Sequence, residues 1–292
     1  MAIVNRYRAL VALMACAGAL GGGAAAAETS SAPAFDDVGL KSQAALVVDL
    51  DSGETLVAKN ADAVVPVASL TKLMTGLVVL ESGLPHDERL EISRDDFYPA
   101  KPTPSKLAPG VTLTRGELLL LALMASENRA ALALSRHYPG GREAFLARMN
   151  AKARELGMPS THFDDPAGLS YASVSTARDL HRLVEAAAAE PLIAEYSTRR
   201  DARVRAGRRT VAFINSNRLV RRGGQWDIAL QKTGYTHEAG RCLAMQARVA
   251  GRRLSMVFLD SFGKLTRYGD ASRVRRRLER ETHARAAPAA AP

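Results

Sequence analysis

The sequence predicts an α+β fold in which one antiparallel sheet, made from both ends of the chain, is flanked by helices and interrupted by an inserted helical lobe. Strand-like runs lie at residues 44–59 and again beyond residue 202. The stretch from about 85 to 200 instead carries helical periodicity and capping signals. The cleft between sheet and lobe is therefore the expected binding site.

Residues 1–27 are expected to be a secretory signal peptide that is not part of the fold. Arg6 and Arg8 form a basic start, residues 9–20 are apolar, and small alanines follow as a cleavage site. The apolar run is too short for a mature membrane anchor. Cleavage predicts an exported protein, and a loose lipobox at Cys16 leaves lipid anchoring as the less favoured alternative.

The exported chain is expected to be one domain with short ends. Residues 28–41 contain serine, alanine and proline and are predicted to be a mobile leader. The domain spans 42–282, with the helical lobe inserted at about 85–200. Residues 283–292 are rich in alanine and proline and are predicted to be disordered.

The first elements are a hairpin and a helix. Runs at 44–49 and 54–59 flank the turn residues 51–53, which predicts two paired strands. Residues 68–81 are predicted to be helical, and Gly83 ends that helix.

The lobe is predicted to be built from several helices. Thr114 and Glu117 have the spacing of a capping box and open a helix at 115–124, which a break at 126–128 interrupts. Further helices are expected at 129–137, 140–156 and 175–189, and from Pro191 onward.

Beyond residue 202 the pattern changes to strands, with hairpins expected around Gly207 and Gly251. The expected strands are 203–204, 210–213, 228–231, 242–249 and 253–259. A basic helix at 267–281 follows them.

Basic residues dominate the charge, with 40 Lys and Arg against 30 Asp and Glu. They crowd the C-terminal third, which favours attraction to a polyanion. Nucleic acid is not expected, because the chain is exported and has few aromatic rings to stack on bases. Peripheral contact of this third with anionic cell-wall material or a membrane is one expectation, and solvated helix faces are the other.

The remaining cysteine and the histidines do not predict a metal or cofactor site. Cys242 lies in an apolar run and is expected to be a buried free thiol. The six histidines show no metal-ligand spacing. Neither a metal nor a cofactor is expected.

Ser69 and Lys72 are the first candidate catalytic pair. Three residues apart at the start of a helix, they lie on one face, and a serine beside a lysine is a nucleophile with a base candidate. The spacing alone is weak, because Ser-x-x-Lys is expected about once by chance in a chain of this length. A second copy occurs at Ser261 and Lys264.

Two further motifs change the weight of the first. Ser126-Glu127-Asn128 falls in the break within the lobe, and Lys232-Thr233-Gly234 ends a strand. With Ser69-x-x-Lys72, this order resembles the penicillin-recognising serine peptidases and class A β-lactamases. The resemblance implies a β-lactamase/transpeptidase-like fold.

In this arrangement the catalytic residues are Ser69, Lys72 and Ser126. Ser69 Oγ attacks a carbonyl, and Lys72 serves as its base only when neutral. Burial and a cationic Lys232 would both lower the pKa of Lys72. Ser126 is expected to relay a proton between Lys72 and the leaving amine.

The remaining motif residues are expected to bind substrate. Asn128 holds Lys72 and a substrate amide, while Lys232 and Thr233 bind the carboxylate beside the scissile bond. Gly234 allows close approach to the strand edge. The backbone N–H groups of Ser69 and Tyr235 are the expected oxyanion hole.

Over residues 42–281 the chain resembles the low-molecular-weight penicillin-binding proteins with D-alanyl-D-alanine carboxypeptidase or endopeptidase activity. Within that family it is most similar to the short periplasmic endopeptidases of Gram-negative bacteria. The similar segments are Met124-x-Ser126-Glu127-Asn128-Arg129-Ala130-Ala131, Tyr138-Pro139-Gly140-Gly141 and Glu238-Ala239-Gly240-x-Cys242-Leu243.

The resemblance implies a periplasmic hydrolase that cleaves D-alanyl cross-links between peptidoglycan peptide stems through an acyl-enzyme on Ser69. It also implies inhibition by β-lactams. Residues 161–170 lack the Glu-x-x-x-Asn deacylation element of class A β-lactamases, so a β-lactam should leave Ser69 slowly. A D-alanyl-D-alanine carboxypeptidase and a non-catalytic cell-wall-binding protein are the alternatives.

Overall fold

The computed structural model of the chain describes residue 35 and residues 38–98, 103–222 and 224–286. The predicted signal peptide and Cys16 lie outside these residues, as do most of the predicted leader and the end of the predicted tail.

A five-stranded antiparallel sheet joins the two ends of the domain, as the sequence predicted. Its strand order is β2-β1-β11-β10-β9. Strand β1 pairs with β11, with Leu46 opposite Val257, so the last strand is laid beside the first. The strands are β1 (Ser42–Asp49), β2 (Thr55–Lys59), β9 (Asp227–Thr236), β10 (Gly240–Val249) and β11 (Arg252–Ser261).

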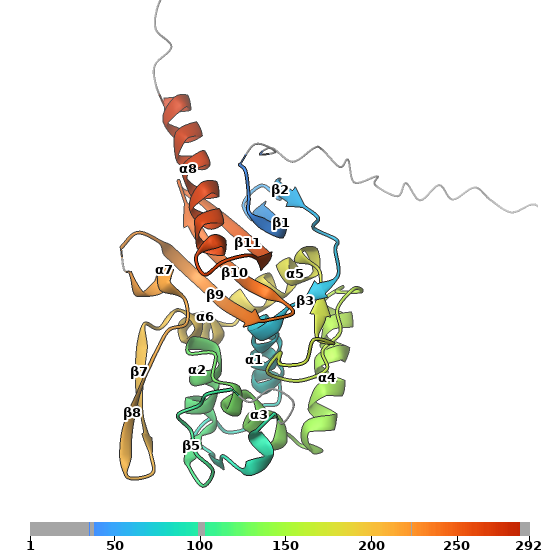
Figure 1. Cartoon of the computed structure of the whole chain (residues 1–292), viewed down its shortest axis with the longest axis vertical. Coiled ribbons are helices and arrows are strands. Elements are labelled where there is room, and N and C mark those ends of the chain that lie inside the picture. The colour runs from blue at the N-terminus through green and yellow to red at the C-terminus, as the bar shows by residue number, and fades with distance from the viewer. Residues whose placement is uncertain (1–34, 36–37, 99–102, 223, 287–292) are drawn as a thin grey trace, which may run out of the picture. The chain divides into compact units, whose positions relative to one another are not determined.

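Both faces of the sheet are covered by helices, because each strand buries alternate residues on opposite sides. In β1, Ala45 and Val47 face the apolar cluster that includes Leu278 of helix α8 (Thr266–Ala286), whereas Leu46 faces the other cluster. Helices α5 (Ala177–Ala188) and α6 (Pro191–Thr198) pack on that second face. Figure 1 shows α8 along one side of the sheet and α5 behind it.

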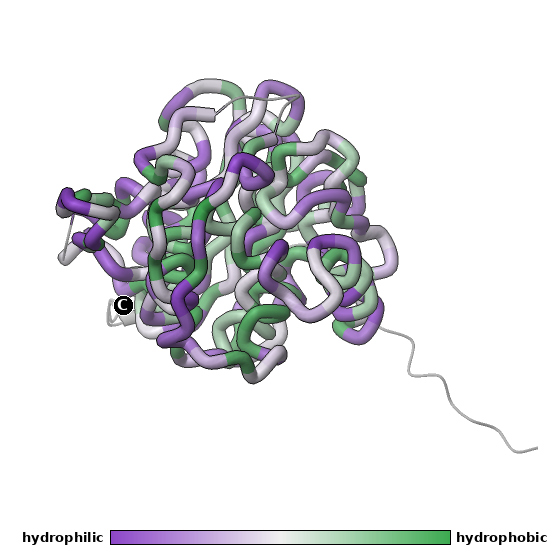
Figure 2. Tube along the Cα trace, turned by 90° about the horizontal axis from the view of Figure 1, so that it is seen from below, coloured by the Kyte–Doolittle hydropathy of each residue, from purple (hydrophilic) through white to green (hydrophobic). Residues whose placement is uncertain are grey.

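Helix α1 is the centre of the helical region. Its residues from Lys72 to Val79 are all buried, and it contacts each of the other helices between residues 115 and 198. These include α2 (Arg115–Met124), α3 (Asn128–Arg136) and α4 (Gly141–Glu155). Apolar segments run through the interior and hydrophilic ones lie mostly on the outer turns (Figure 2).

Short strands and a hairpin complete the domain. Strands β7 and β8 form a two-stranded sheet that extends away from the main one (Figure 1), with the exposed Arg203, Arg205, Arg208 and Arg209 along it. The remaining elements are β3 (Val65–Pro66), β4 (Arg89–Glu91), η2 (Arg94–Asp96), β5 (Thr112–Thr114), β6 (Val174–Ser175), β7 (Asp201–Ala206), β8 (Arg209–Ile214) and α7 (Arg218–Arg221).

Side-chain caps determine where two helices of the lobe begin. The capping box predicted before α2 is present: Glu117 N donates to Thr114 Oγ1 at 3.1 Å and Thr114 N donates to Glu117 Oε2 at 2.8 Å. Helix α5 is capped by Thr176 rather than Ser175, because Asp179 N donates to Thr176 Oγ1 at 3.0 Å while Ser175 pairs in β6.

Both ends of the domain are more ordered than the sequence suggested. Phe35, in the predicted mobile leader, is only 3% exposed, and its N–H donates to Leu56 O at 2.9 Å. Helix α8 continues to Ala286, through residues expected in the disordered tail. Burial of Leu278 on the sheet fixes the helix axis, and arginine and alanine favour its continuation. No helix in the described part of the chain is long and apolar enough to cross a membrane.

Candidate active site

Ser69 lies in a tight turn before α1. The single helix expected at 68–81 is a 3₁₀ turn, η1 (Ala68–Thr71), followed by α1 (Lys72–Glu81). Ala68 has φ +48°, a left-handed conformation that strains a residue with a Cβ atom. Such strain is concentrated at functional sites, where the surrounding structure holds it in place.

Lys72 is fully buried and makes three hydrogen bonds. Its Nζ lies 2.9 Å from Ser69 Oγ, 2.7 Å from Asn128 Oδ1 and 2.7 Å from Ala167 O. The two carbonyl oxygens can only accept, whereas the hydroxyl can also donate. A neutral Lys72 therefore satisfies all three contacts by donating to the carbonyls and accepting from Ser69, which is the arrangement a general base needs.

The charge of Lys72 is weakened by its environment. Burial lowers its pKa to about 7, against the opposing attraction of Asp165 and Glu127. Near neutral pH a large fraction of Lys72 is therefore unprotonated and able to accept the Ser69 proton.

Lys232 is also fully buried, and its Nζ donates to Ser126 Oγ at 2.8 Å and to Thr233 O at 2.9 Å. Burial, followed by the nearby charges of Lys72 and Arg267, lowers the pKa of Lys232 well below its ordinary value. The sequence expected a cationic Lys232 to lower the pKa of Lys72. In the structure the charge of Lys72 instead lowers the pKa of Lys232. The reason is that Asp165 and Glu127 stabilise the Lys72 ammonium, whereas no carboxylate of the described residues is among the causes that act on Lys232.

The break between α2 and α3 places Ser126 and Asn128 beside two different lysines. Ser126 has φ +61° and its hydroxyl meets Lys232, while Asn128 begins α3 and its amide oxygen meets Lys72. Asn128 Nδ2 donates to Thr103 Oγ1 at 3.1 Å, which fixes the amide orientation. Glu127 caps α3 by accepting from Arg129 N.

Strand β9 forms the other wall and is the edge strand of the sheet. A Cβ atom at Gly234 would lie 3.1 Å from Val67 O and 3.2 Å from Ser69 N. Glycine is therefore favoured at 234 by the turn that carries Ser69, because this turn packs closely on β9. The Tyr235 side chain is 55% exposed beneath the guanidinium of Arg241, which lies 4.1 Å from its ring centroid.

The loop at residues 165–170 carries the Ala167 carbonyl, a contact of Lys72 that the sequence did not predict. Asp165 Oδ1 accepts from Ala167 N at 2.7 Å and its Oδ2 accepts from Ser170 N at 2.8 Å. The carboxylate thus shapes the loop that presents Ala167 O to Lys72. The only sequence signal was the Asp165-Pro166-x-Gly168 turn chemistry.

Ser216 was also missed. Thr233 Oγ1 donates to Ser216 Oγ at 2.7 Å, and Ser216 N donates to Met124 O at 2.9 Å. One residue thus connects β9 to the end of α2, two positions before Ser126. Its short polar neighbours, Asn215 and Asn217, resemble any loop, so no pattern indicated it.

The second Ser-x-x-Lys is structural. Ser261 Oγ lies 2.7 Å from Ser42 Oγ, which donates to Asp270 Oδ2 at 2.6 Å, while Lys264 is exposed. These bonds tie the ends of β1 and β11 to α8.

Cys242 is the buried free thiol that the sequence predicted, with a pKa that burial raises to about 12. Within the residues that the structure describes, no group of three histidine, cysteine, aspartate or glutamate side chains could hold a metal ion.

Comparison with known proteins agrees with this geometry. The D-alanyl-D-alanine endopeptidase of Pseudomonas aeruginosa is 47% identical over 82% of this chain and 78% of its own length. The protein of the same name from Escherichia coli is 43% identical over 87% of this chain and 83% of its own. The Streptomyces K15 DD-transpeptidase structure has a TM-score of 0.75 and 26% identity, covering 84% of this chain and 98% of its own.

A cefotaxime-bound penicillin-binding protein D2 from Listeria monocytogenes has a TM-score of 0.70 and 29% identity, over 84% of this chain and 98% of its own. These neighbours confirm the predicted transpeptidase-like fold. The family profile described as D-alanyl-D-alanine carboxypeptidase, peptidase family S11, matches residues 27–263. The resemblance seen in the motifs is thus confirmed, and the chain belongs to the S11 family of serine peptidases.

Proposed function

We propose that this protein is a serine-type D-alanyl-D-alanine endopeptidase that hydrolyses peptide cross-links in peptidoglycan through an acyl-enzyme on Ser69. The observation that carries the proposal is the 2.9 Å hydrogen bond between Ser69 Oγ and a buried Lys72 whose pKa is about 7. Two relatives at 47% and 43% identity carry the endopeptidase name, which favours this activity over the carboxypeptidase.

In the proposed acylation, neutral Lys72 takes the hydroxyl proton of Ser69 as Oγ attacks the D-alanyl carbonyl carbon. The oxygen charge that develops is stabilised by the backbone N–H groups of Ser69 and Tyr235. The carbonyl then re-forms and the C–N bond breaks, and the proton that Lys72 took passes to the leaving amine, which leaves Lys72 neutral again. Water next attacks the ester while Lys72 takes its proton, and Lys72 returns a proton to Ser69 Oγ as the acyl group leaves.

Ser126 and Lys232 complete the proton path in this proposal. The carboxylate beside the scissile bond binds at Lys232 and Thr233, and its negative charge raises the pKa of Lys232 from its lowered value in the free protein. The bound carboxylate thus favours the cationic form of Lys232. Ser126, 2.8 Å from Lys232 Nζ, relays to the leaving amine the proton that Lys72 took from Ser69.

β-Lactams are proposed to acylate the same serine and to leave slowly. The acidic side chain of the nearby loop, Asp165, is occupied by the N–H groups of Ala167 and Ser170. It is therefore engaged in loop structure rather than in activating a water for deacylation. The cefotaxime-bound Listeria relative supports β-lactam recognition by this fold.

The proposed site of action is the periplasm, reached through cleavage of residues 1–27. Exposed arginines on β7 and β8 are available for peripheral contact with anionic wall or membrane material. Lipid attachment at Cys16 remains the less favoured alternative.

The test is muropeptide analysis after digestion of purified peptidoglycan with wild-type protein and with Ser69→Ala. The endopeptidase converts cross-linked dimers into monomers, and Ser69→Ala does not. Release of free D-alanine from pentapeptides with dimers untouched would instead identify a carboxypeptidase. Absence of both reactions, together with no penicilloyl adduct by intact mass, would identify a non-catalytic wall-binding protein.

A further inference from the structure

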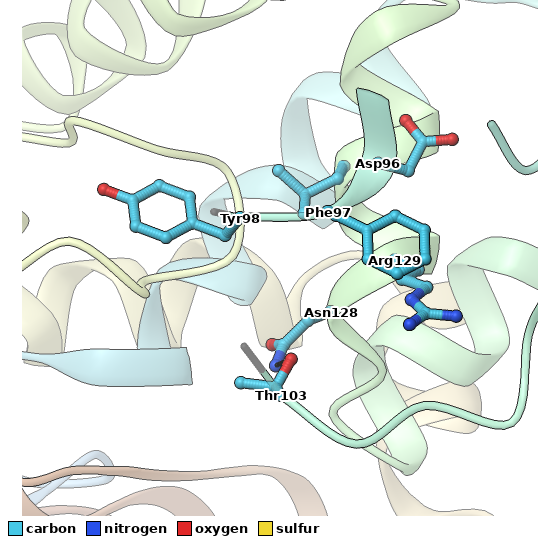
Figure 3. Close-up of a pocket in the computed structure, with 7 residues that line it drawn as sticks. Asp96, Phe97, Tyr98, Thr103, Asn128 and Arg129 are labelled. Carbon is cyan, nitrogen blue, oxygen red and sulfur yellow. Dashed lines mark hydrogen bonds between the residues drawn. The ribbon is translucent and has the colours of Figure 1, made fainter. Parts of the chain in front are cut away.

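A cavity of about 160 Å³ adjoins the active site on the Asn128 side. Its walls include Phe97, Tyr98, Thr103, Asn128 and Arg129 (Figure 3). Asn128 belongs to both sites, because its amide oxygen accepts from Lys72 while its amide nitrogen contacts Thr103. The cavity therefore begins one side chain away from the proposed base.

In the proposed reaction the leaving group is held at Lys232 and Ser126, whereas Asn128 contacts Lys72. The rest of the acyl donor must extend from Ser69 away from the leaving group. With Asn128 as the expected partner of its backbone amide, a donor side chain next to that amide would lie beside the cavity.

Arg129 gives this cavity a positive charge. Its guanidinium lies 3.6 Å from the centroid of the Phe97 ring, and one nitrogen donates to Leu107 O. Figure 3 shows the Phe97 ring against the Arg129 side chain. No carboxylate in the described part of the chain forms a salt bridge with Arg129.

Asp96, the other charged residue among the described walls, is already neutralised. Asp96 is fully buried, and its carboxylate pairs with Arg136 at 2.9 Å and with Arg142 at 3.6 Å. In Figure 3 the Asp96 carboxylate points away from Asn128. Among the wall residues that the structure describes, the cavity therefore presents one cation, Arg129, held flat by an aromatic ring, a geometry suited to binding a planar carboxylate.

The cavity of about 160 Å³ has room for several water molecules or for a small polar group such as a carboxylate arm.

We propose that this cavity is a subsite for a carboxylate on the acyl-donor stem peptide and that Arg129 is its specificity-determining residue. The inference rests on the proposed endopeptidase function and specifies which donor stems the enzyme accepts. Two stem carboxylates have this chemistry: the one at the end of the diamino acid side chain and the α-carboxylate of the acidic residue that precedes it.

The experiment measures kcat/KM on a matched set of cross-linked dimers. One dimer has both donor-stem carboxylates free, a second has the diamino acid carboxylate amidated, and a third has the acidic residue amidated. Wild type should prefer the free dimer over one of the amidated dimers by about tenfold or more, the range for a hydrogen bond to a charged group. The amidation that lowers kcat/KM identifies which of the two stem carboxylates the cavity binds.

Arg129→Gln should remove this preference and keep kcat/KM on that amidated dimer within about twofold of wild type. Arg129→Lys should retain part of the preference, because it keeps the charge but not the planar fork. The matched control is Arg94→Gln, which removes an exposed charge three residues before Phe97 without touching the cavity. It should keep the full preference.

β-Lactam acylation measured on each variant separates this subsite from the catalytic centre. Arg129→Gln should form the penicilloyl adduct at the wild-type rate, which shows that Asn128 and Lys72 are undisturbed. If Arg129→Gln lost kcat/KM equally on all three dimers, the subsite would be overturned. The same conclusion would follow if the wild-type protein hydrolysed all three dimers at equal rates. A wild-type protein that hydrolyses none of them would refute the proposed function itself.

Discussion

A Cβ atom on Gly168 would lie 1.9 Å from the carbonyl oxygen of Ala68. Gly168 also has φ +71°, a conformation that glycine adopts without strain. This contact lets the loop at 165–170 lie against the nucleophile turn, so that Ala167 O reaches Lys72 Nζ at 2.7 Å. The orientation of the proposed base thus depends on a residue that has no side chain.

Gly168→Ala is expected to slow β-lactam acylation of Ser69 by tenfold or more and to lower the melting temperature. The added methyl group collides with backbone atoms that cannot rotate away, so either the loop or η1 must move. Acylation is measured by intact mass under pre-steady-state conditions and stability by thermal unfolding. Gly207→Ala is the matched control: it has φ +64° and no atom within 4 Å of the added carbon. It should lose only about 1 kcal/mol of stability and acylate normally; equal behaviour of the two variants would contradict the role of the contact.

The acylation rate is expected to fall with decreasing pH through about 7. Burial lowers the pKa of Lys72 to about 7, so below that pH the ammonium predominates and cannot accept the Ser69 proton. The rate should drop about tenfold per pH unit below the pKa and level off above it. Single-turnover acylation between pH 5.5 and 8.5 tests this. A flat profile across that range would mean that Lys72 is not the base.

The motifs made much of this site predictable from sequence. Ser69 and Lys72 have the helical spacing that places them on one face, and Lys232-Thr233-Gly234 falls on a strand whose alternation is clear. The pairing of β1 with β11 followed from strands at both chain ends with helices between them. Each of these inferences depends on local periodicity or on side-chain chemistry that the sequence displays directly.

The remainder arises from contacts between distant segments. Ala167 acts through its backbone carbonyl, which has no signature in the sequence. Ser216 matters because its hydroxyl meets Thr233, 17 positions away, across a loop. The relative charge of the two lysines also escaped prediction, since it depends on which of them lies near Asp165 and Glu127 after folding.

Ser216→Ala is expected to weaken substrate binding more than turnover. The variant removes the acceptor for Thr233 Oγ1, which the proposed mechanism uses to hold the substrate carboxylate. Loss of one hydrogen bond of about 1 kcal/mol corresponds to a roughly fivefold higher KM, with kcat changed less. Ser216→Thr, which restores a hydroxyl, should recover part of the affinity. A fall in kcat alone, with KM unchanged, would argue against this positioning role.

The two Ser-x-x-Lys copies predict opposite behaviour for their serines. Ser69→Ala should abolish the penicilloyl adduct with little loss of stability, because Ser69 is half-buried and the described partners of its Oγ are Lys72 Nζ and Ala167 O. Ser261→Ala should retain the adduct but lose about 1–3 kcal/mol, since its hydroxyl is buried against Ser42. Intact mass and chemical unfolding on both variants measure the two effects in parallel. An adduct that survives Ser69→Ala and disappears in Ser261→Ala would exchange the assignments and remove the basis for the catalytic site described above.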